Sequence, residues 1–151
     1  YLLLISAILS FSVRMTADAI EMLKGFPVTE QKSLGEFLKK NGLESGYASF
    51  WNSSVVTVST ENEVKVRAII ALHNNQYWRY SENPEPYTWL CKTNWYKEYA
   101  NFVITSEGDD FGITPEKIIN YFGQPQNVLE FSKWKILVYE NDLSSRLFNN
   151  K

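Results

Sequence analysis

Residues 46–59 read Gly46-Tyr47-Ala48-Ser49-Phe50-Trp51-Asn52-Ser53-Ser54-Val55-Val56-Thr57-Val58-Ser59, and this stretch decides the fold. Its first half predicts a strand over 43–50 that turns at Trp51-Asn52. The valines that follow suit either a strand or a helix, because β-branched residues favour strands. A clear strand follows at 64–70, and two parallel strands need a crossover between them, for which only residues 53–60 are available. We therefore expect a short crossover helix at 53–60.

The rest of the chain continues this alternation of helices and strands. Apolar periodicity and end signals predict helices over 29–41, 86–98 and 114–122, and strands over 100–105, 127–131 and 135–139. The last two strands read as an antiparallel pair at the sheet edge. The pattern predicts an α/β fold: a three-layer sandwich with a mostly parallel, Rossmann-like sheet and an antiparallel edge hairpin.

The amino end carries an uncharged apolar run, LLLISAILSFSV over residues 2–13, which stops at Arg14. The chain begins at Tyr1 rather than Met, so we expect it to be cut from a longer protein. The run fits the end of a transmembrane helix, the remainder of a secretory signal, or a buried helix, and we favour the first. The expected organisation is the end of a membrane helix at 1–14, a connector at 15–30 and an extracytoplasmic α/β domain at 31–148.

Composition narrows the classes of function. The net charge of −2 argues against nucleic acid as a partner, because nucleic acids select basic surfaces. One cysteine, Cys91, and one histidine, His73, allow neither an internal disulfide nor a histidine-based metal site. We expect Cys91 to be a buried thiol. No cofactor motif, catalytic triad or phosphate-binding glycine loop is present in the sequence, so we expect no cofactor and assign no catalytic residue.

The aromatic residues supply the candidate ligand site, which we assign to Tyr47, Trp51, Asn52 and Trp89. Trp51 and Asn52 follow the carboxyl end of a predicted strand, the edge where open α/β sheets bind ligands. Trp51 there would stack on a sugar ring and Asn52 would hydrogen-bond its hydroxyls, or else both would simply cap the core and the helix.

Three further patterns each have a functional and a plain explanation. Trp89, Trp95 and Tyr96 share one predicted helix and read as core or as a belt on lipid headgroups. The acidic residues Glu107, Asp109 and Asp110 read as a solvated turn or as oxygen ligands for a hard cation. Asn52-Ser53-Ser54 matches a glycosylation sequon, which we expect to be occluded.

Residues 46–53, the strand at 64–70, ANFVIT at 100–105 and KILVY at 135–139 together resemble a known family. They are similar to the C-terminal extracytoplasmic domain of polytopic bacterial membrane proteins of the dolichyl-phosphate-mannose mannosyltransferase-like (GT-C) type. The resemblance covers roughly residues 30–140. It implies a place at the cell membrane, on the extracytoplasmic side.

In that family the catalytic acidic residues lie in loops of the membrane portion, outside this chain. The resemblance therefore implies a domain that is non-catalytic by itself and helps position a lipid-linked sugar donor or a glycan acceptor. The alternative is a protein-interaction or assembly module of a membrane protein, with no ligand. Whether the parent is an enzyme stays open at this point.

Overall fold

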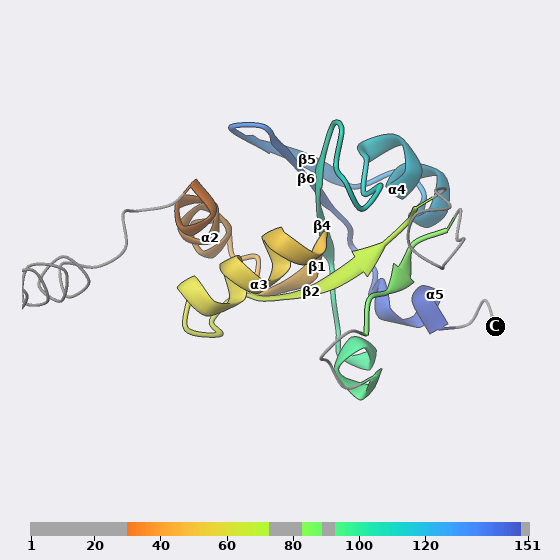
Figure 1. Cartoon of the computed structure of the whole chain (residues 1–151), viewed down its shortest axis with the longest axis horizontal. Helices are drawn as coiled ribbons and strands as arrows, with labels where there is room; N and C mark the ends of the chain where they lie inside the picture. Colours follow the sequence, from red (N-terminus) through yellow and green to blue (C-terminus); the bar gives the residue numbers. More distant parts are fainter. Residues whose placement is uncertain (1–29, 73–82, 89–92, 149–151) are drawn as a thin grey trace, which may run out of the picture.

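The computed structural model describes residues 30–72, 83–88 and 93–148, and its centre is a six-stranded sheet in the order β3-β2-β1-β4-β6-β5 (Figure 1). The elements in chain order are α2 (Glu30–Lys40), β1 (Ser45–Ala48), α3 (Phe50–Ser59), β2 (Lys65–Ile70), β3 (Glu85–Pro86), the 3-10 helix η2 (Thr93–Lys97), β4 (Phe102–Ser106), α4 (Pro115–Phe122), β5 (Asn127–Phe131), β6 (Trp134–Val138) and α5 (Ser144–Phe148). In these ranges no helix is long and apolar enough to cross a membrane. The expected membrane helix end at 1–14 and the connector up to residue 29 lie outside them.

The α/β class is confirmed, but the sheet is mixed rather than mostly parallel. Strand β1 pairs in parallel with β2 and β4, while β3, β6 and β5 add antiparallel pairings at the two sides. The predicted antiparallel pair at the edge is confirmed, because β5 and β6 form a hairpin with β5 outermost. The strand predicted at 100–105 is β4, which lies inside the sheet between β1 and β6.

The predicted crossover helix is also confirmed, and it begins earlier than expected. Strand β1 ends at Ala48 and α3 begins at Phe50, so Trp51 and Asn52 lie in the first helical turn rather than in a turn before the helix. Ser49 is the N-cap in an extended conformation. The parallel register, with Gly46 opposite Val66, follows from this short crossover.

The helix predicted at 86–98 is wrong where the chain is described. Pro86 lies opposite Ile69 in the short strand β3, and only residues 93–97 are helical, as a 3-10 turn. Proline opens many helices, which explains the prediction. Proline is also tolerated in an edge strand, because the N–H that it lacks would face solvent there. Residues 89–92, which include Trp89 and Cys91, lie outside the described ranges.

Two apolar clusters cover the two faces of the sheet. Consecutive strand residues alternate between them: Tyr47 belongs to one cluster and Ala48 to the other. The cluster with Ala48 includes Leu34 and Leu38 of α2 and Val56 of α3, and these two helices lie side by side (Figure 1). In the cluster with Tyr47, η2, α4 and α5 pack on the sheet. They contribute Tyr96 from η2, Ile118 and Phe122 from α4, and Leu147 from α5.

Candidate ligand surface on helix α3

Helix α3 begins at the carboxyl end of the parallel strands, next to a topological switch. The connection after β1 runs through α3 to β2 on one face of the sheet. The connection after the neighbouring strand β4 runs through α4 on the other face. Open α/β sheets bind ligands where two such connections part. Trp51 and Asn52 follow the carboxyl end of β1, as the sequence predicted.

The chain itself fills the space between these two connections. The loop after β4 reaches across β1 to the end of β2, where Ala71 N–H donates to the carbonyl of Phe111 at 2.8 Å. Lys117 Nζ donates to the carbonyl of Ala71 at 2.7 Å. Gly112 has a φ of +72°, and a Cβ there would lie 2.2 Å from the Ala71 oxygen, so only glycine fits. The loop after β4 therefore occupies the place between the strand ends where a ligand of an open α/β sheet would lie.

An aromatic cluster covers this filled edge. The ring of Phe50 lies 5.1 Å from Trp51, 5.5 Å from Tyr87 and 6.2 Å from Phe111, measured between centroids. Tyr87 and Phe111 are 5.7 Å apart. The contacts of Trp51 and Tyr87 with Phe50 are edge-to-face, a preferred aromatic arrangement. Trp51 is the exposed end of the cluster, at 64% exposure, and its contact with Phe50 restrains the indole while leaving most of its surface accessible.

Helix α3 is buried on one face and carries exposed apolar side chains on the other. Its inner face buries Ser53, Val56 and Thr57 against the sheet. Its outer face carries Trp51, Val55 and Val58 at helical positions i, i+4 and i+7, with Val55 37% and Val58 76% exposed. We call these three residues the α3 stripe. The helix contains no charged residue, whereas the outer face of a surface helix is normally polar or charged.

A shallow apolar groove of about 210 Å³ runs beside the α3 stripe. Phe50, Ser54 and Val58 of α3 form one wall, and Trp95 of η2 contributes to the lining. The remaining lining residues include Val66 and Ala68 of β2. Val58 therefore belongs to both the groove and the stripe. Trp95 was predicted to lie on one helix with Trp89 and Tyr96, but it is half-buried at this groove while Tyr96 is buried in the core.

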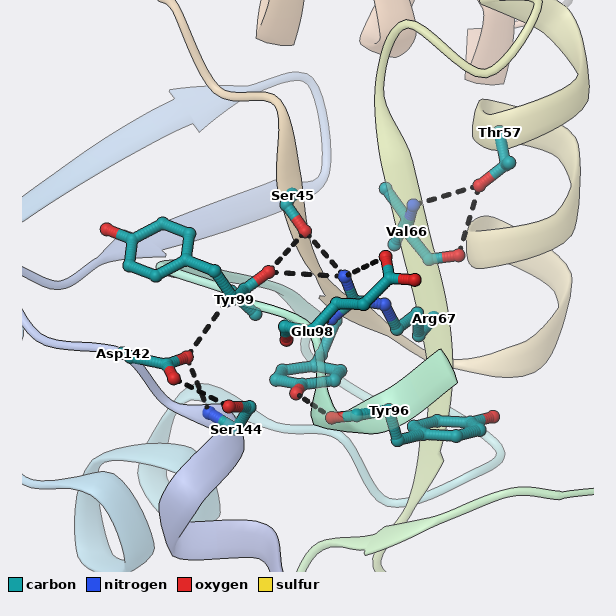
Figure 2. A network of polar contacts seen from close by, with 11 residues as sticks. Ser45, Thr57, Val66, Arg67, Tyr96, Glu98, Tyr99, Asp142 and Ser144 are labelled. Atoms are coloured by element: carbon teal, nitrogen blue, oxygen red, sulfur yellow. Dashed lines mark hydrogen bonds and ion pairs between the residues drawn. The ribbon is translucent and has the colours of Figure 1, made fainter. Parts of the chain in front are cut away.

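The groove cannot accept a strand by backbone pairing at Val66, because Thr57 occupies that edge of β2. The Val66 N–H donates to Thr57 Oγ1 at 2.9 Å, and the Thr57 hydroxyl donates to the Val66 carbonyl at 3.0 Å (Figure 2). The next outward carbonyl, that of Ala68, accepts from Tyr87 N–H at 2.9 Å. The backbone groups of Val66 and the Ala68 carbonyl are therefore already hydrogen-bonded at this edge of β2. The groove offers a ligand mainly apolar contacts.

The structure does not bring all predicted site residues together. Tyr47 is fully buried, and its hydroxyl donates to the Tyr96 carbonyl at 3.1 Å. Burial raises the pKa of Tyr47 to about 12, against the opposing charge of Arg67, so the phenol stays neutral. Asn52 is half-buried beside Trp51, and its Nδ2 donates to Ser49 Oγ at 3.1 Å. Trp51 and Asn52 thus lie together at the surface, whereas Tyr47 is buried in the cluster on the opposite face of the sheet from α3.

Sequence reasoning missed Arg67, a fully buried cation in strand β2. Its guanidinium donates to the Glu98 carbonyl at 2.9 Å, to Ser45 Oγ at 2.8 Å and to the Tyr99 carbonyl at 3.2 Å (Figure 2). The Glu98 carboxylate lies 3.5 Å away. These bonds attach the segment before β4 to β1 and β2. The sequence signal for this site was an arginine inside the otherwise largely apolar strand predicted at 64–70. An arginine in a buried strand indicates that hydrogen-bond acceptors surround it in the interior.

Two of the three acidic residues that follow β4 have partners within the chain. Asp109 Oδ1 accepts from the N–H groups of Phe111 at 2.9 Å and Ile113 at 3.3 Å. Glu107 forms an ion pair with Lys135 at 3.5 Å. Across the described ranges no group of three or more histidine, cysteine or acidic residues is placed to hold a metal ion.

Comparisons of the chain with protein-family models, with curated protein sequences and with solved structures gave no match.

Proposed function

We propose that this chain is the outer, extracytoplasmic domain of a membrane glycosyltransferase-like protein. It is non-catalytic by itself and helps to position a lipid-linked sugar donor or a glycan acceptor. One observation carries the proposal: an uncharged helix at the ligand-binding edge of the sheet exposes Trp51 and two valines in one line. Exposed apolar surface of this kind marks an interaction site in soluble domains.

The shape of this surface suits a ligand with a sugar and a hydrocarbon part. The indole of Trp51 offers a flat face on which a sugar ring stacks, and Asn52 beside it offers an amide oxygen. The α3 stripe continues away from Trp51 through Val55 to Val58, and the apolar groove beside Val58 takes a hydrocarbon chain. In this proposal Trp51 faces the sugar and Val58 faces the lipid.

We further propose that the architecture is a three-layer, Rossmann-like sandwich. The two apolar clusters support this, since α2 and α3 pack in one and α4 and α5 in the other. The β1–α3–β2 unit supplies the parallel crossover typical of that architecture.

Binding of a polyprenyl-phosphate-linked sugar in detergent micelles tests the proposed function. The chain should bind it more tightly than it binds the same polyprenyl phosphate without sugar. Trp51→Ala should weaken that binding about tenfold, equivalent to about 1.4 kcal/mol. Tyr99→Ala is the matched control, because Tyr99 is another exposed aromatic residue, outside α3. Equal affinity of the wild type and Trp51→Ala, with full activity of a parent protein lacking the domain, would remove the proposed role.

A protein-assembly module is the second candidate, and the α3 stripe itself favours it. Positions i, i+4 and i+7 of a helix are also the spacing with which one amphipathic helix packs on another. A photoreactive amino acid at position 58 of the parent protein, in its native membrane, separates the two. Lipid adducts support the donor-positioning role, whereas a single protein adduct supports assembly.

A further inference from the structure

A second hollow, of about 620 Å³, lies at the opposite end of the sheet from Trp51. It is formed by the end of α4, the loop after β6 and helix α5. Strand β6 runs antiparallel to β4, with Val138 opposite Phe102, so the loop after β6 lies where β4 begins. Trp51 follows the end of β1, which is parallel to β4. We call this hollow the polar groove. Its volume falls in the range of small-molecule sites.

The frame of the polar groove is held by hydrogen bonds within the chain. Asp142 Oδ1 accepts from Ala100 N–H at 3.0 Å and from Ser144 N–H at 2.9 Å, and its Oδ2 accepts from the Ser144 hydroxyl at 2.6 Å (Figure 2). Arg146 Nη1 donates to the Phe122 carbonyl at 2.8 Å. The Tyr139 hydroxyl donates to the Gly123 carbonyl at 3.2 Å. The loop, α4 and α5 are thereby fixed around the groove before any ligand arrives.

Asp142 belongs to this frame and is not a free ligand group. Burial by itself would raise the pKa of Asp142, but the hydrogen bonds from Ser144 and Ala100, with the charge of Arg67, hold it below its ordinary value. Asp142 is therefore ionised at neutral pH, and both of its oxygens accept hydrogen bonds from the chain. A divalent cation would compete with those bonds, so the groove is poorly suited to a metal.

The rim carries three side-chain amides and one carboxylate that are exposed to solvent. Within the described part of the chain, none of these four side chains is hydrogen-bonded or ion-paired to another residue; they are Gln124, Gln126, Glu140 and Asn141. Amides both donate and accept, and a carboxylate accepts. The remaining N–H groups of Arg146 add further donors. The rim thus offers donors and acceptors within one hollow.

We propose that this groove binds a neutral saccharide. Hydroxyl groups donate and accept at once, which matches a rim of mixed amides, carboxylate and guanidinium. A phosphate offers mainly hydrogen-bond acceptors and would meet the negative charges of Glu140 and Asp142, and Arg146 is the only cation among the lining residues that the structure describes. An ammonium group only donates hydrogen bonds and would leave the amide and guanidinium N–H groups unmatched. Saccharide binding in the polar groove does not require the α3 surface to bind anything.

Amide chemical shifts of the isotope-labelled chain, residues 1–151, test the proposal. The probes are neutral oligosaccharides of glucose, galactose, mannose, rhamnose and N-acetylglucosamine, with inorganic phosphate and calcium chloride as separate arms. At least one oligosaccharide should shift the amides of Gln124, Gln126, Glu140 and Asn141 saturably. Loss of two ligand-bonding amides in Gln126→Ala/Asn141→Ala should weaken that binding about tenfold or more. Asn120→Ala, an exposed amide of α4 outside the groove, should leave it unchanged.

The design separates this site from the α3 surface. Trp51→Ala should bind the same oligosaccharide at the groove with unchanged affinity, whatever the result for lipid-linked sugar. Three results would overturn the proposal: phosphate or calcium shifts these amides while no oligosaccharide does, the oligosaccharide shifts gather around Trp51 instead, or no probe shifts the groove. Gln126 and Asn141 are exposed, so we expect the double variant to fold normally. Unchanged amide chemical shifts in the rest of its spectrum will verify this.

Discussion

Helices α3 and α4 follow two neighbouring parallel strands, β1 and β4, and pack on opposite faces of the sheet, yet their outer faces differ. Helix α4 buries Ile118 and Phe122 and exposes Glu116 and Asn120. It has an N-cap, Thr114, and ends at Gly123, as predicted from the sequence. Helix α3 exposes Trp51, Val55 and Val58, carries no charge and has no side-chain hydrogen bond at its cap.

Helix α4 therefore has a polar outer face, whereas helix α3 has an apolar outer face that is exposed to solvent. The outer face of α4 gains nothing from further burial, because it is polar. The α3 stripe leaves apolar area in water, and burying such area stabilises a complex by roughly 25 cal/mol per Å². We expect the domain to fold without these exposed side chains, and their apolar character supports the proposed interaction. The following substitutions test the two faces of each helix.

The largest effect is expected on the inner face of α4. Ile118→Ala should lower the free energy of unfolding by about 3 kcal/mol, because it leaves a cavity in a fully buried position. Asn120→Ala on the exposed face should change it by less than about 0.5 kcal/mol. Urea titrations followed by circular dichroism measure both. Equal values would mean that α4 does not have the polar, non-contacting outer face described above.

A second substitution tests how α3 holds the edge of β2. Thr57→Val keeps the shape but leaves the N–H and carbonyl of Val66 without their partner, which should destabilise the domain by about 2 kcal/mol. Thr57→Ser retains the hydroxyl and should cost clearly less. If both variants were equally unstable in urea, the methyl group rather than the hydroxyl would be the contribution of Thr57.

The contrast between the helices also explains what the sequence could predict. Helix α4 has local signals at both ends, Thr114-Pro115 and Gly123, together with one apolar stripe, so its bounds followed directly. Helix α3 lacks such signals, and it was found only because parallel strands need a crossover. Strand β3 was missed because two residues that include a proline carry no strand pattern, and pairing with Ile69 and Ile70 decides their conformation.

The candidate site was predictable in part, for the same reason. The position of Trp51 at the strand end followed from the order of elements. Its exposure did not, because the β-branched run masked the helical period; once 50–59 is placed as a helix, Trp51, Val55 and Val58 fall opposite Val56. The burial of Tyr47 could not be predicted, because both faces of a central strand are buried and alternation there identifies no outward side. The polar groove joins residues 122–126 to 139–146 and depends on tertiary packing alone.

A smaller effect is expected at the helix caps. Thr114 Oγ1 accepts from the Lys117 N–H at 3.5 Å, and Thr114→Ala should cost about 1 kcal/mol of stability. Ser49 makes no such bond to its helix, so Ser49→Ala should cost less than half as much. Thermal unfolding of the two variants compares them. A larger loss for Ser49→Ala would mean that its contact with Asn52 Nδ2, rather than capping, orders the start of α3.

The smallest effect on stability, and the largest on binding, is expected on the α3 stripe. Val58→Ser should change the free energy of unfolding by less than about 0.5 kcal/mol, because Val58 is 76% exposed. The same change places a hydroxyl where we propose that a hydrocarbon chain binds, so affinity for polyprenyl-phosphate-linked sugar should fall, whereas binding of an oligosaccharide in the polar groove should not. If Val58→Ser instead destabilised the isolated chain as much as Thr57→Val, the stripe would already be covered within this chain, and α3 would resemble α4 in needing no partner.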